Sequence, residues 1–468
     1  MATSRDRPMT DQHFQVAIIG AGPAGMAAAC TTTKAGLHTI VIDDQKDSGG
    51  QVYRNLKANH SLSPAYLGDS YYAGTKLSND FAACGANYLT DCTVWQITNS
   101  HEIALVSRGK AELITADYII IATGAIERAM PVKGWTLPGV MSVGGAQTLL
   151  KQAALGADEA VFVGSGPLLY LTVWQYIKAG LSVRAVLDTT GRSQWLSALP
   201  FAPLAFLQPD MLAMGQKWLR EIRQKVDVIT NVEGVEIAGR SQVEALSYTT
   251  SSRERIDLPA KHVFLHQGVI PNINLSMATG LEHRWDQKAH YWTPVTDATG
   301  KSSDEQIYIA GDGNGVGGAK AAAITGQLSA SAIVARYGKP RLMAQLYYKL
   351  RHLHFLSIRP FLDRLYLPEV QFRIPQNDET IICRCEAVTK ADINTALGSG
   401  ATGPNQLKAF SRAGMGRCQG RTCGLMVQEM IADHTGQSMA AIGYYRLRPP
   451  VKPITLAELA SLEGAWPQ

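Results

Sequence analysis

The feature that most constrains the fold of this chain is a glycine-rich turn between a β-branched run and a run of small, helix-forming residues. Gly20, Gly22 and Gly25 fit the pattern GxGxxG, directly after the strand-like residues 16–19. The first glycine permits the tight turn, the second lets the backbone approach a pyrophosphate, and the third lets helix and strand pack closely. Asp43 lies 23 residues after Gly20, where it is placed to accept hydrogen bonds from a ribose. The sequence therefore predicts a strand–helix–strand fold that binds a dinucleotide.

A second turn of this kind begins 144 residues later with Gly164 and Gly166, which predicts a duplicated fold rather than a solenoid. Asp188 follows the next strand-like run and is placed to hold a ribose, so that a 2′-phosphate is disfavoured. Leu169 stands where a small residue normally lets helix and strand approach. Three interpretations of this second fold stay open: a nicotinamide dinucleotide site, a site for a structural adenine nucleotide, and a fold without a ligand.

Composition excludes several classes of protein. The 468 residues suffice for about three domains, and 46% hydrophobic with 18% charged residues is a globular balance. A net charge of +5 is too small for a nucleic-acid-binding face. We find no apolar run of the roughly 18 residues that a membrane span needs and no signal segment before residue 16. We therefore expect a cytoplasmic protein whose seven cysteines are thiols or metal ligands, not disulfides.

Four of those cysteines form the sharpest local signal. Cys383 and Cys385 are followed, after a gap of 32 residues, by Cys418 and Cys423. Four thiolates from two loops suit either an iron–sulfur cluster or zinc, and the one-residue gap in the first pair is unusual for structural zinc. Nearby glycines and arginines favour a cluster, because they supply backbone amides and offset negative charge. The remaining cysteines are scattered and are predicted to be small core residues: Cys30, Cys84 and Cys92.

Four motifs resemble those of the two-dinucleotide-domain flavoproteins, the superfamily of glutathione- and thioredoxin-reductase-like enzymes. They are GAGPAG at 20–25, SGGQ at 48–51, TADYIIIATGA at 115–125 and IYIAGDG at 307–313. The resemblance implies that the first fold holds FAD, with Gln51 approaching the flavin, Gly124 turning near the cofactor and Asp312 facing the ribityl chain. Val94 is similar in position to the residue whose backbone meets the adenine. Leu171 departs from the family, since disulfide reductases carry a glutamate there.

The whole chain resembles the α subunits of opine oxidases, and residues 378–435 resemble a bacterioferritin-associated-ferredoxin-like [2Fe–2S] module. The likeness is carried by GGQVYR at 49–54, GWTLPGVMSVGGAQ at 134–147, FLHQGVIPN at 264–272 and the cysteine arrangement. Hydrogen cyanide synthase B subunits and the α subunits of multi-subunit proline or hydroxyproline dehydrogenases are related families. The implied fold class is α/β: a two-dinucleotide-binding-domain flavoprotein with a small C-terminal [2Fe–2S] domain.

The resemblance also implies how such a chain works. In these families a D-amino-acid-oxidase-like flavoprotein, the separate β subunit, oxidises the amine, and some complexes have a further small subunit. The α subunit passes electrons through flavin and the cluster to a quinone or another acceptor. We therefore expect an oxidoreductase subunit that has no catalytic residue for the amine and is inactive without its partner.

Several alternatives stay open at this level. A self-contained NADH-dependent reductase and a glycine dehydrogenase subunit of the hydrogen cyanide synthase type are the rival enzymes, and a zinc-bearing scaffold is the third class. The nucleotide of the first fold, an FMN at a subunit interface, the amine and the electron acceptor are also undetermined.

The order of the motifs divides the chain into five parts. The linker at 339–377 is basic, aromatic and helical in period, with a break at Pro360. Three interpretations of the linker stay open: a helix packed on the flavoprotein part of the same chain, a docking surface for a partner subunit, and a peripheral membrane helix. The predicted parts are an FAD-binding domain at 1–140 and 262–338, a second dinucleotide-binding-like domain at 141–261, the linker, a [2Fe–2S] domain at 378–435 and an extended tail at 436–468.

Overall fold

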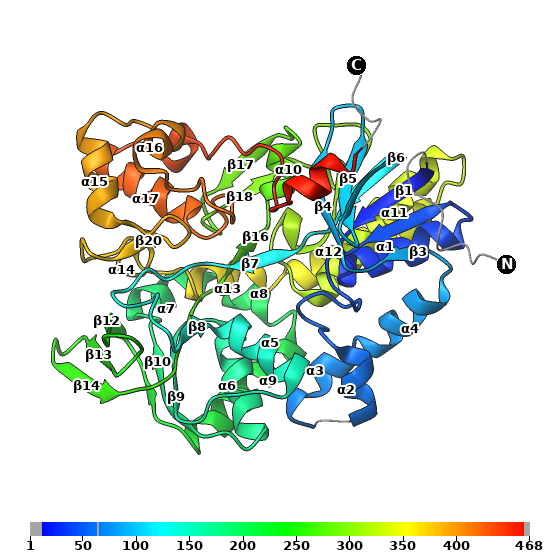
Figure 1. Cartoon of the computed structure of the whole chain (residues 1–468). Coiled ribbons are helices and arrows are strands. Elements are labelled where there is room, and N and C mark those ends of the chain that lie inside the picture. Colours follow the sequence, from blue (N-terminus) through cyan, green and yellow to red (C-terminus); the bar gives the residue numbers. More distant parts are fainter. Residues whose placement is uncertain (1–11, 63–64, 463–468) are drawn as a thin grey trace.

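Two parallel β-sheets, each built around one of the glycine turns, organise the fold, and a helical module stands beside them (Figure 1). The computed structural model describes residues 12–62 and 65–462. The first sheet and its helices lie above the second in Figure 1, and the module, drawn in orange, lies on the left.

The first sheet has seven strands, in the order β3-β2-β1-β6-β5-β4, with β19 also paired to β6. Parallel pairing joins β1, β2, β3, β19 and the end of β6, while β4, β5 and the start of β6 form an antiparallel meander. The β-branched run of β2 is buried at every position, as expected for a strand covered on both faces. The strands are β1 (His13–Ile19), β2 (Thr39–Ile42), β3 (Asn87–Leu89), β4 (Cys92–Ile97), β5 (Glu102–Ser107), β6 (Lys110–Ile121) and β19 (Ile307–Ile309).

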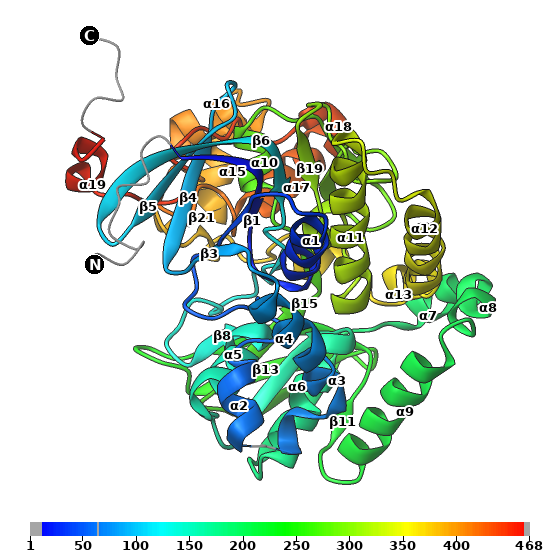
Figure 2. The same cartoon turned by 90° about the vertical axis from the view of Figure 1, so that its right-hand side faces the viewer.

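Helices α1 (Pro23–Lys34) and α11 (Ala319–Arg336) pack side by side over this sheet, as Figure 2 shows. Both helices are rich in small residues, so their backbones approach closely. A Cβ atom on Gly326 would lie only 2.0 Å from the carbonyl oxygen of Ala24. This contact places the 3₁₀ turn η3 (Gly311–Asn314), just before α11, beside the first glycine turn.

The second sheet is parallel and has the order β11-β10-β9-β15-β8. Strand β15 pairs with β9 and β8, so the predicted division at residue 262 falls just before a strand that completes this second sheet. An antiparallel sheet, β12-β13-β14, follows β11. The strands are β8 (Val140–Ser142), β9 (Ala160–Ser165), β10 (Val183–Asp188), β11 (Val228–Ile229), β12 (Val232–Ala238), β13 (Ala245–Thr250), β14 (Arg255–Pro259) and β15 (Val263–Gln267).

Five helices accompany the second sheet, and two short ribbons belong to neither sheet, of which the first runs between the two sheets and the second precedes β19. One ribbon pairs β7 with β16, and the other pairs β17 with β18. The helices are α5 (Val143–Ala153), α6 (Pro167–Lys178), α7 (Arg192–Ala198), α8 (Ala202–Ala205) and α9 (Pro209–Arg223). The ribbon strands are β7 (Ala125–Glu127), β16 (Val269–Pro271), β17 (His283–Asp286) and β18 (Tyr291–Pro294). Between β2 and β3 the chain forms three helices, α2 (Leu56–Leu62), α3 (Asp69–Tyr72) and α4 (Thr75–Ala83). Helix α10 (Asn274–Ala278) follows β16.

The linker forms three helices, and the break predicted at Pro360 is confirmed, since this proline lies in the first turn of the second of them. The tail after residue 435 contains two short helices, and its last one packs against β6 of the first sheet. No helix in the described part of the chain is long and apolar enough to cross a membrane. The elements are α12 (Leu342–Leu356), α13 (Arg359–Leu365), α14 (Val370–Arg373), β20 (Ile381–Cys383), β21 (Val388–Thr389), α15 (Lys390–Gly398), α16 (Pro404–Ser411), α17 (Gly424–Thr435), α18 (Met439–Ile442) and α19 (Leu456–Ala460).

Candidate functional site

The first glycine turn joins β1 to α1 in the geometry of a phosphate-binding loop. Gly20 has a φ of 107°, and a Cβ atom there would lie 2.4 Å from the carbonyl oxygen of Ala122. A Cβ atom on Gly25 would lie 1.8 Å from the carbonyl oxygen of Gly20, so only glycine lets the helix start this close to the strand. A Cβ atom on Gly22 would meet nothing outside its own helix and chain neighbours closer than the Cα of Gly50 at 3.9 Å, so there is room for a group to approach at the positive end of α1.

Asp43 lies directly after β2, as predicted, and closes this turn. Its carboxylate accepts hydrogen bonds from the backbone N–H of Ala21 at 2.5 Å and of Gln45 at 2.8 Å. Burial raises the pKa of Asp43 above its ordinary value, and the two N–H donors oppose that shift. The carbonyl oxygen of Asp43 accepts from the N–H of Cys92, which brings the start of β4 beside the acid.

Three more predicted segments meet around this turn. Gly50, in the turn that carries Gln51, packs so closely that a Cβ atom on it would lie 3.0 Å from the Cα of Gly22. Gly124 has a φ of 69° and lies against Gly313, the neighbour of Asp312. The structure therefore brings together the parts of the chain around residues 20–25, 43, 49–51, 122–124 and 311–313.

Two of the predicted residues have further contacts that define their places. Asp312 is half-buried, accepts from the backbone N–H groups of Gly317 and Gly318 at 3.0 Å each, and has its pKa raised by the surrounding protein, which removes water from the carboxylate. Val94 lies inside β4, pairs with Leu105 of β5 and contributes its side chain to the core. Gln51, by contrast, is exposed.

The second glycine turn has the same backbone shape, with φ of 138° at Gly164 and 108° at Gly166. The linker lies beside this turn. A Cβ atom on Gly166 would lie 4.0 Å from Cγ of Tyr366, and 3.9 Å from the ring of His266. Asp188, placed to hold a ribose, instead accepts hydrogen bonds from the hydroxyl of Tyr170 at 2.5 Å and the N–H of Thr190 at 2.8 Å.

Further linker residues continue this contact along the ends of the strands. The carbonyl oxygen of Leu367 accepts from Nε2 of Gln194 at 3.2 Å, and the carboxylate of Glu369 lies 2.6 Å from where a Cβ atom on Gly191 would stand. The pKa of Tyr366 is raised by burial and by the nearby carboxylate of Asp188. The sequence did not predict that Tyr366 lies near both Gly166 and Asp188. The residue pattern of the linker does not identify the surface that the linker covers.

The four C-terminal cysteines lie in two hydrogen-bonded pairs. Cys383 pairs with Cys423, and Cys385 pairs with Cys418. The hydrogen bond from Cys423, together with backbone N–H donors that include that of Gly414, lowers the pKa of Cys383 to about 6. Within residues 12–62 and 65–462 no group of three or more His, Cys, Asp or Glu side chains is arranged to hold a metal ion. The structure thus brings the four predicted thiols together as two pairs.

The cysteine-bearing loop rests on the first domain. Asn274 donates from Nδ2 to the carbonyl oxygen of Gln419 at 2.9 Å. Two residues earlier, Asn272 donates its N–H to the carbonyl oxygen of Gly124 at 3.0 Å. A short segment therefore connects the turn at Gly124 directly to the loop between Cys418 and Cys423.

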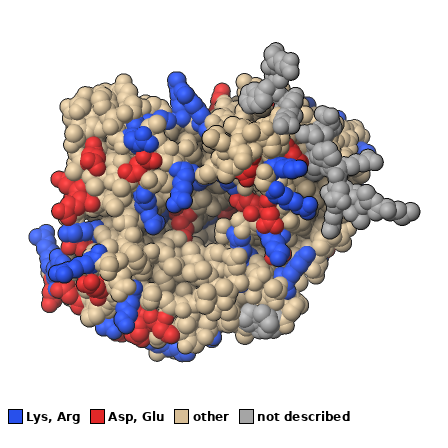
Figure 3. All heavy atoms as spheres, viewed as in Figure 1, with Lys and Arg blue, Asp and Glu red and all other residues tan. Residues whose placement is uncertain are grey.

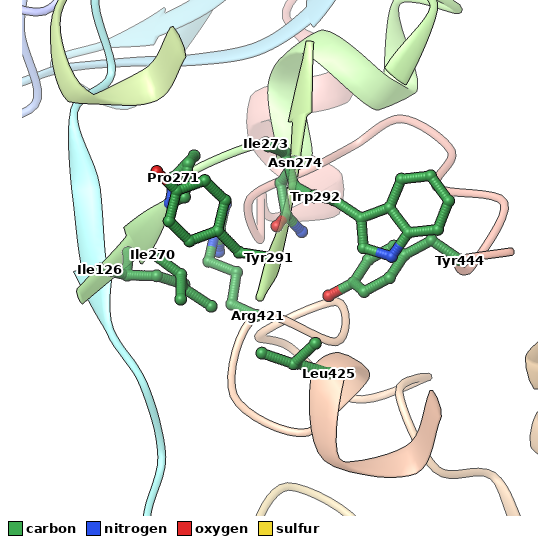
Figure 4. Close-up of a pocket in the computed structure, with 10 residues that line it drawn as sticks. All are labelled: Ile126, Ile270, Pro271, Ile273, Asn274, Tyr291, Trp292, Arg421, Leu425 and Tyr444. Carbon is green, nitrogen blue, oxygen red and sulfur yellow. The ribbon is translucent and has the colours of Figure 1, made fainter. Parts of the chain in front are cut away.

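A small, partly open pocket lies at this contact. Figure 4 shows the side chain of Arg421 extending from the cysteine loop toward Ile270 and Tyr291, with Trp292 and Tyr444 on the other side. Nη2 of Arg421 donates to the carbonyl oxygen of Val451 at 2.9 Å, and burial lowers the pKa of Arg421. In the space-filling view of Figure 3, charged side chains surround a hollow at the centre of this face.

A buried ionic cluster that sequence reasoning missed fixes the module in place. Glu429 of α17 lies 2.5 Å from Nη1 of Arg373, 3.4 Å from Nε2 of His290 and 3.9 Å from Nη1 of Arg128. Glu429 and Arg128 are both buried. Arg128 directly follows the β7 strand, so this cluster joins the module, the linker and the ribbon between the two sheets.

Comparison with known proteins agrees with this architecture. The family model "Pyridine nucleotide-disulphide oxidoreductase" matches residues 14–327, and "Sarcosine oxidase A3 domain" matches residues 377–462. The solved structure of L-proline dehydrogenase from P. horikoshii has a TM-score of 0.73 with this chain, covering 97% of it and 81% of that chain at 19% identity. The predicted α/β fold with two dinucleotide-binding units is thereby confirmed.

Two sets of curated relatives extend over nearly the whole chain. The A subunit of opine oxidase from Rhizobium meliloti is 41% identical over 96% of this chain and 88% of the relative, and that from Agrobacterium tumefaciens (strain Ach5) is 41% identical over 96% and 92%. Hydrogen cyanide synthase subunit HcnB of Pseudomonas aeruginosa is 30% identical over 96% and 99%. The chain therefore belongs to the family of opine oxidase A subunits, which are oxidoreductases, within the pyridine nucleotide-disulphide oxidoreductase family.

Proposed function

We propose that this chain is the electron-transferring subunit of a hetero-oligomeric amine dehydrogenase or oxidase. Relatives that are named as subunits support a multi-subunit complex. In that complex a partner β subunit oxidises a secondary amine of the opine type to an imine. The amine loses two electrons and two protons, and the imine then takes up water and splits into a carbonyl compound and an amine. The electrons leave through this chain toward a quinone or another acceptor.

The first fold is proposed to hold FAD. The open backbone at Gly22, the donors at the start of α1 and the acidic groups of Asp43 and Asp312 suit the pyrophosphate and the hydroxyls of such a group. FAD supplies two-electron chemistry when bound. Gln51, Gly124 and Val94 are the further residues proposed to contact it.

The two cysteine pairs are proposed to hold a [2Fe–2S] cluster. In such a cluster each iron takes two thiolates, and the pairs Cys383–Cys423 and Cys385–Cys418 match that division. Backbone N–H groups directed at Cys383 stabilise a thiolate in the manner of cluster ligands. A cluster held there exchanges electrons singly.

One observation carries the functional proposal: the loop with Cys418 and Cys423 lies on the segment that pairs with the turn at Gly124. Asn272 contacts Gly124, near which we propose the flavin, and Asn274 contacts Gln419, in the loop for which we propose the cluster. Electron transfer between two centres needs this closeness, and a scaffold does not. A glycine-oxidising complex remains the second candidate, because HcnB is 30% identical over 96% of the chain.

The first experiment is an absorption spectrum of the anaerobically purified whole chain, before and after dithionite, with iron, acid-labile sulfide and zinc analysis. We expect flavin bands and broader iron–sulfur absorption, both bleached by dithionite, with iron and sulfide in equal amounts. Cys385→Ser should lose the iron, whereas Cys84→Ser, outside the pairs, should keep it. Zinc without sulfide, or amine oxidation by the isolated chain, would contradict the proposal.

A further inference from the structure

A buried lysine beside the second sheet reaches the turn that carries Gln51. Lys151 lies in the last turn of α5, and only 4% of it is exposed. Its Nζ atom donates to the carbonyl oxygens of Gln51 and Val52 at 3.1 Å each and to Oε1 of Gln147 at 2.8 Å. An ammonium group has three N–H donors, so each of them has one acceptor here. The three acceptors are all satisfied only while the amine carries its proton.

The same lysine also connects α5 to the helices between β2 and β3. Its carbonyl oxygen accepts from Nδ2 of Asn59 at 2.8 Å and from Nδ2 of Asn55 at 3.3 Å. On the neighbouring helix α6, Gln175 donates from Nε2 to the carbonyl oxygen of Leu67 at 2.9 Å. Figure 2 shows α2 and α3 beside α5 and α6. Polar groups of the second dinucleotide-binding unit therefore hold a segment of the first unit in place.

The turn that Lys151 holds is the one that closes on the first glycine turn. The N–H of Gly49 donates to the carbonyl oxygen of Ala21 at 2.8 Å. A Cβ atom on Gly50 would lie 3.0 Å from the Cα of Gly22. The two carbonyl groups that accept from Lys151 belong to the next two residues of the chain. The position of the lysine amine therefore bears directly on the position of Gly50 against Gly22.

The surroundings of this amine disfavour its charge. Burial and the guanidinium group of Arg54 lower the pKa of Lys151 to about 7. The centre of the Tyr71 ring lies 5.7 Å from Nζ, and the pKa of Tyr71 is raised to about 12 by burial, so its hydroxyl stays neutral. No carboxylate among the described residues pairs with the amine. The amine therefore loses its proton near neutral pH, and a neutral amine has only two N–H donors for the three acceptors.

We propose that Lys151 is a positioning residue for the flavin, and that its ammonium group holds the turn at residues 49–52 in the conformation that binds FAD. This inference rests on the flavin site proposed for the first fold. Loss of the proton leaves one acceptor without a donor, so the turn is held less firmly against Gly22. FAD therefore binds more tightly when the lysine is protonated, and its affinity falls as the pH rises through the pKa of Lys151.

The test is the dissociation constant for FAD of the purified whole chain, measured by equilibrium dialysis from about pH 6 to about pH 8.5, a range in which FAD itself does not titrate. The dissociation constant of the wild-type chain should rise by about tenfold over this range, because one hydrogen bond to a charged group is lost. Lys151→Met should bind FAD about tenfold more weakly than wild type at the lowest pH and should lack the pH dependence. The matched control is Gln194→Met, which removes a buried donor to a backbone carbonyl from α7 and should keep the wild-type affinity and pH profile.

The Arg54→Gln variant separates a titrating lysine from a merely structural one and needs no substitution of Lys151. Without the guanidinium charge the pKa of Lys151 rises, so the midpoint of the FAD affinity profile should move to higher pH. An affinity that is the same at every pH, or a midpoint that stays in place in Arg54→Gln, overturns the proposal and leaves the flavin site standing. A wild-type profile that Lys151→Met retains assigns the titration to another group and also overturns it. A wild-type chain that binds no FAD at any pH overturns the flavin site itself, and this inference with it.

Discussion

At the scale of single residues, the first glycine turn needs glycine because a side chain at its packing position would clash with the backbone. A Cβ atom on Gly25 would lie 1.8 Å from the carbonyl oxygen of Gly20, and that oxygen cannot move without opening the turn. We predict that Gly25→Ala lowers the free energy of unfolding by about 2 kcal/mol or more and abolishes flavin binding. Gly215→Ala in α9, where nothing lies within 4 Å, should leave flavin binding unchanged and raise the free energy of unfolding by up to about 1 kcal/mol.

Thermal unfolding and the flavin absorbance of the purified variants measure both effects. A Gly25→Ala protein with normal flavin content would show that the turn adapts, and the role proposed for this glycine would be wrong. The sequence alone predicted Gly25 as the packing position, because the GxGxxG pattern encodes this clash. The sequence did not predict which groups bind the carboxylate of Asp43. The donors are the backbone N–H groups of Ala21 and Gln45, and every residue except proline has such a group.

At the scale of elements, helix α17 is held by buried charge. Its Glu429 faces Arg373, His290 and Arg128, and the pKa of Glu429 is lowered because hydrogen bonding to His290 and the attraction of Arg373 outweigh burial. We predict that Glu429→Gln costs about 3–5 kcal/mol of stability, because it leaves the guanidinium groups of the buried Arg128 and the half-buried Arg373 without a carboxylate. Asp433→Asn, exposed on the same helix, should change stability by less than about 0.5 kcal/mol.

The pH dependence of urea unfolding provides the second readout for this helix. The folded carboxylate has a pKa below the ordinary value of 4.5, so its stabilisation is complete above that pH and is lost as the pH falls through the folded value. The Glu429→Gln protein should therefore lose less stability than wild type on acidification. An identical pH slope in both proteins would show that Glu429 does not hold the module.

Helices and strands with a regular residue pattern could be predicted from the sequence, whereas the elements that they pack against could not. The two strand–helix–strand units and the helices on either side of Pro360 follow from periodicity and glycine placement. Strand β15 joins the second sheet although it follows the boundary drawn at residue 262, because pairing over long sequence separations leaves no local trace. The pairing of Cys383 with Cys423 is non-local in the same way.

At the scale of the whole molecule, the C-terminal third of the chain packs back on the two dinucleotide-binding units. The linker lays Tyr366 against the second glycine turn, the module rests on residues 272–274, and the tail returns to β6. The linker contact also weighs against a self-contained NADH reductase, since Tyr366 lies beside Gly166 and the carboxylate of Asp188 already accepts a hydrogen bond from the hydroxyl of Tyr170.

We therefore predict that NADH leaves the whole chain unaffected. A ligand at one hundred times its Kd stabilises a protein by about 2.7 kcal/mol, which raises Tm by several degrees. Millimolar NADH should shift Tm by less than about 1 °C and should not bleach the flavin under anaerobic conditions, whereas dithionite should bleach it. The Tyr366→Ala variant separates occlusion from an inherently poor site. If Tm rises with NADH only in that variant, the linker is what closes the second fold, and if NADH bleaches the wild-type flavin, the reductase interpretation replaces ours.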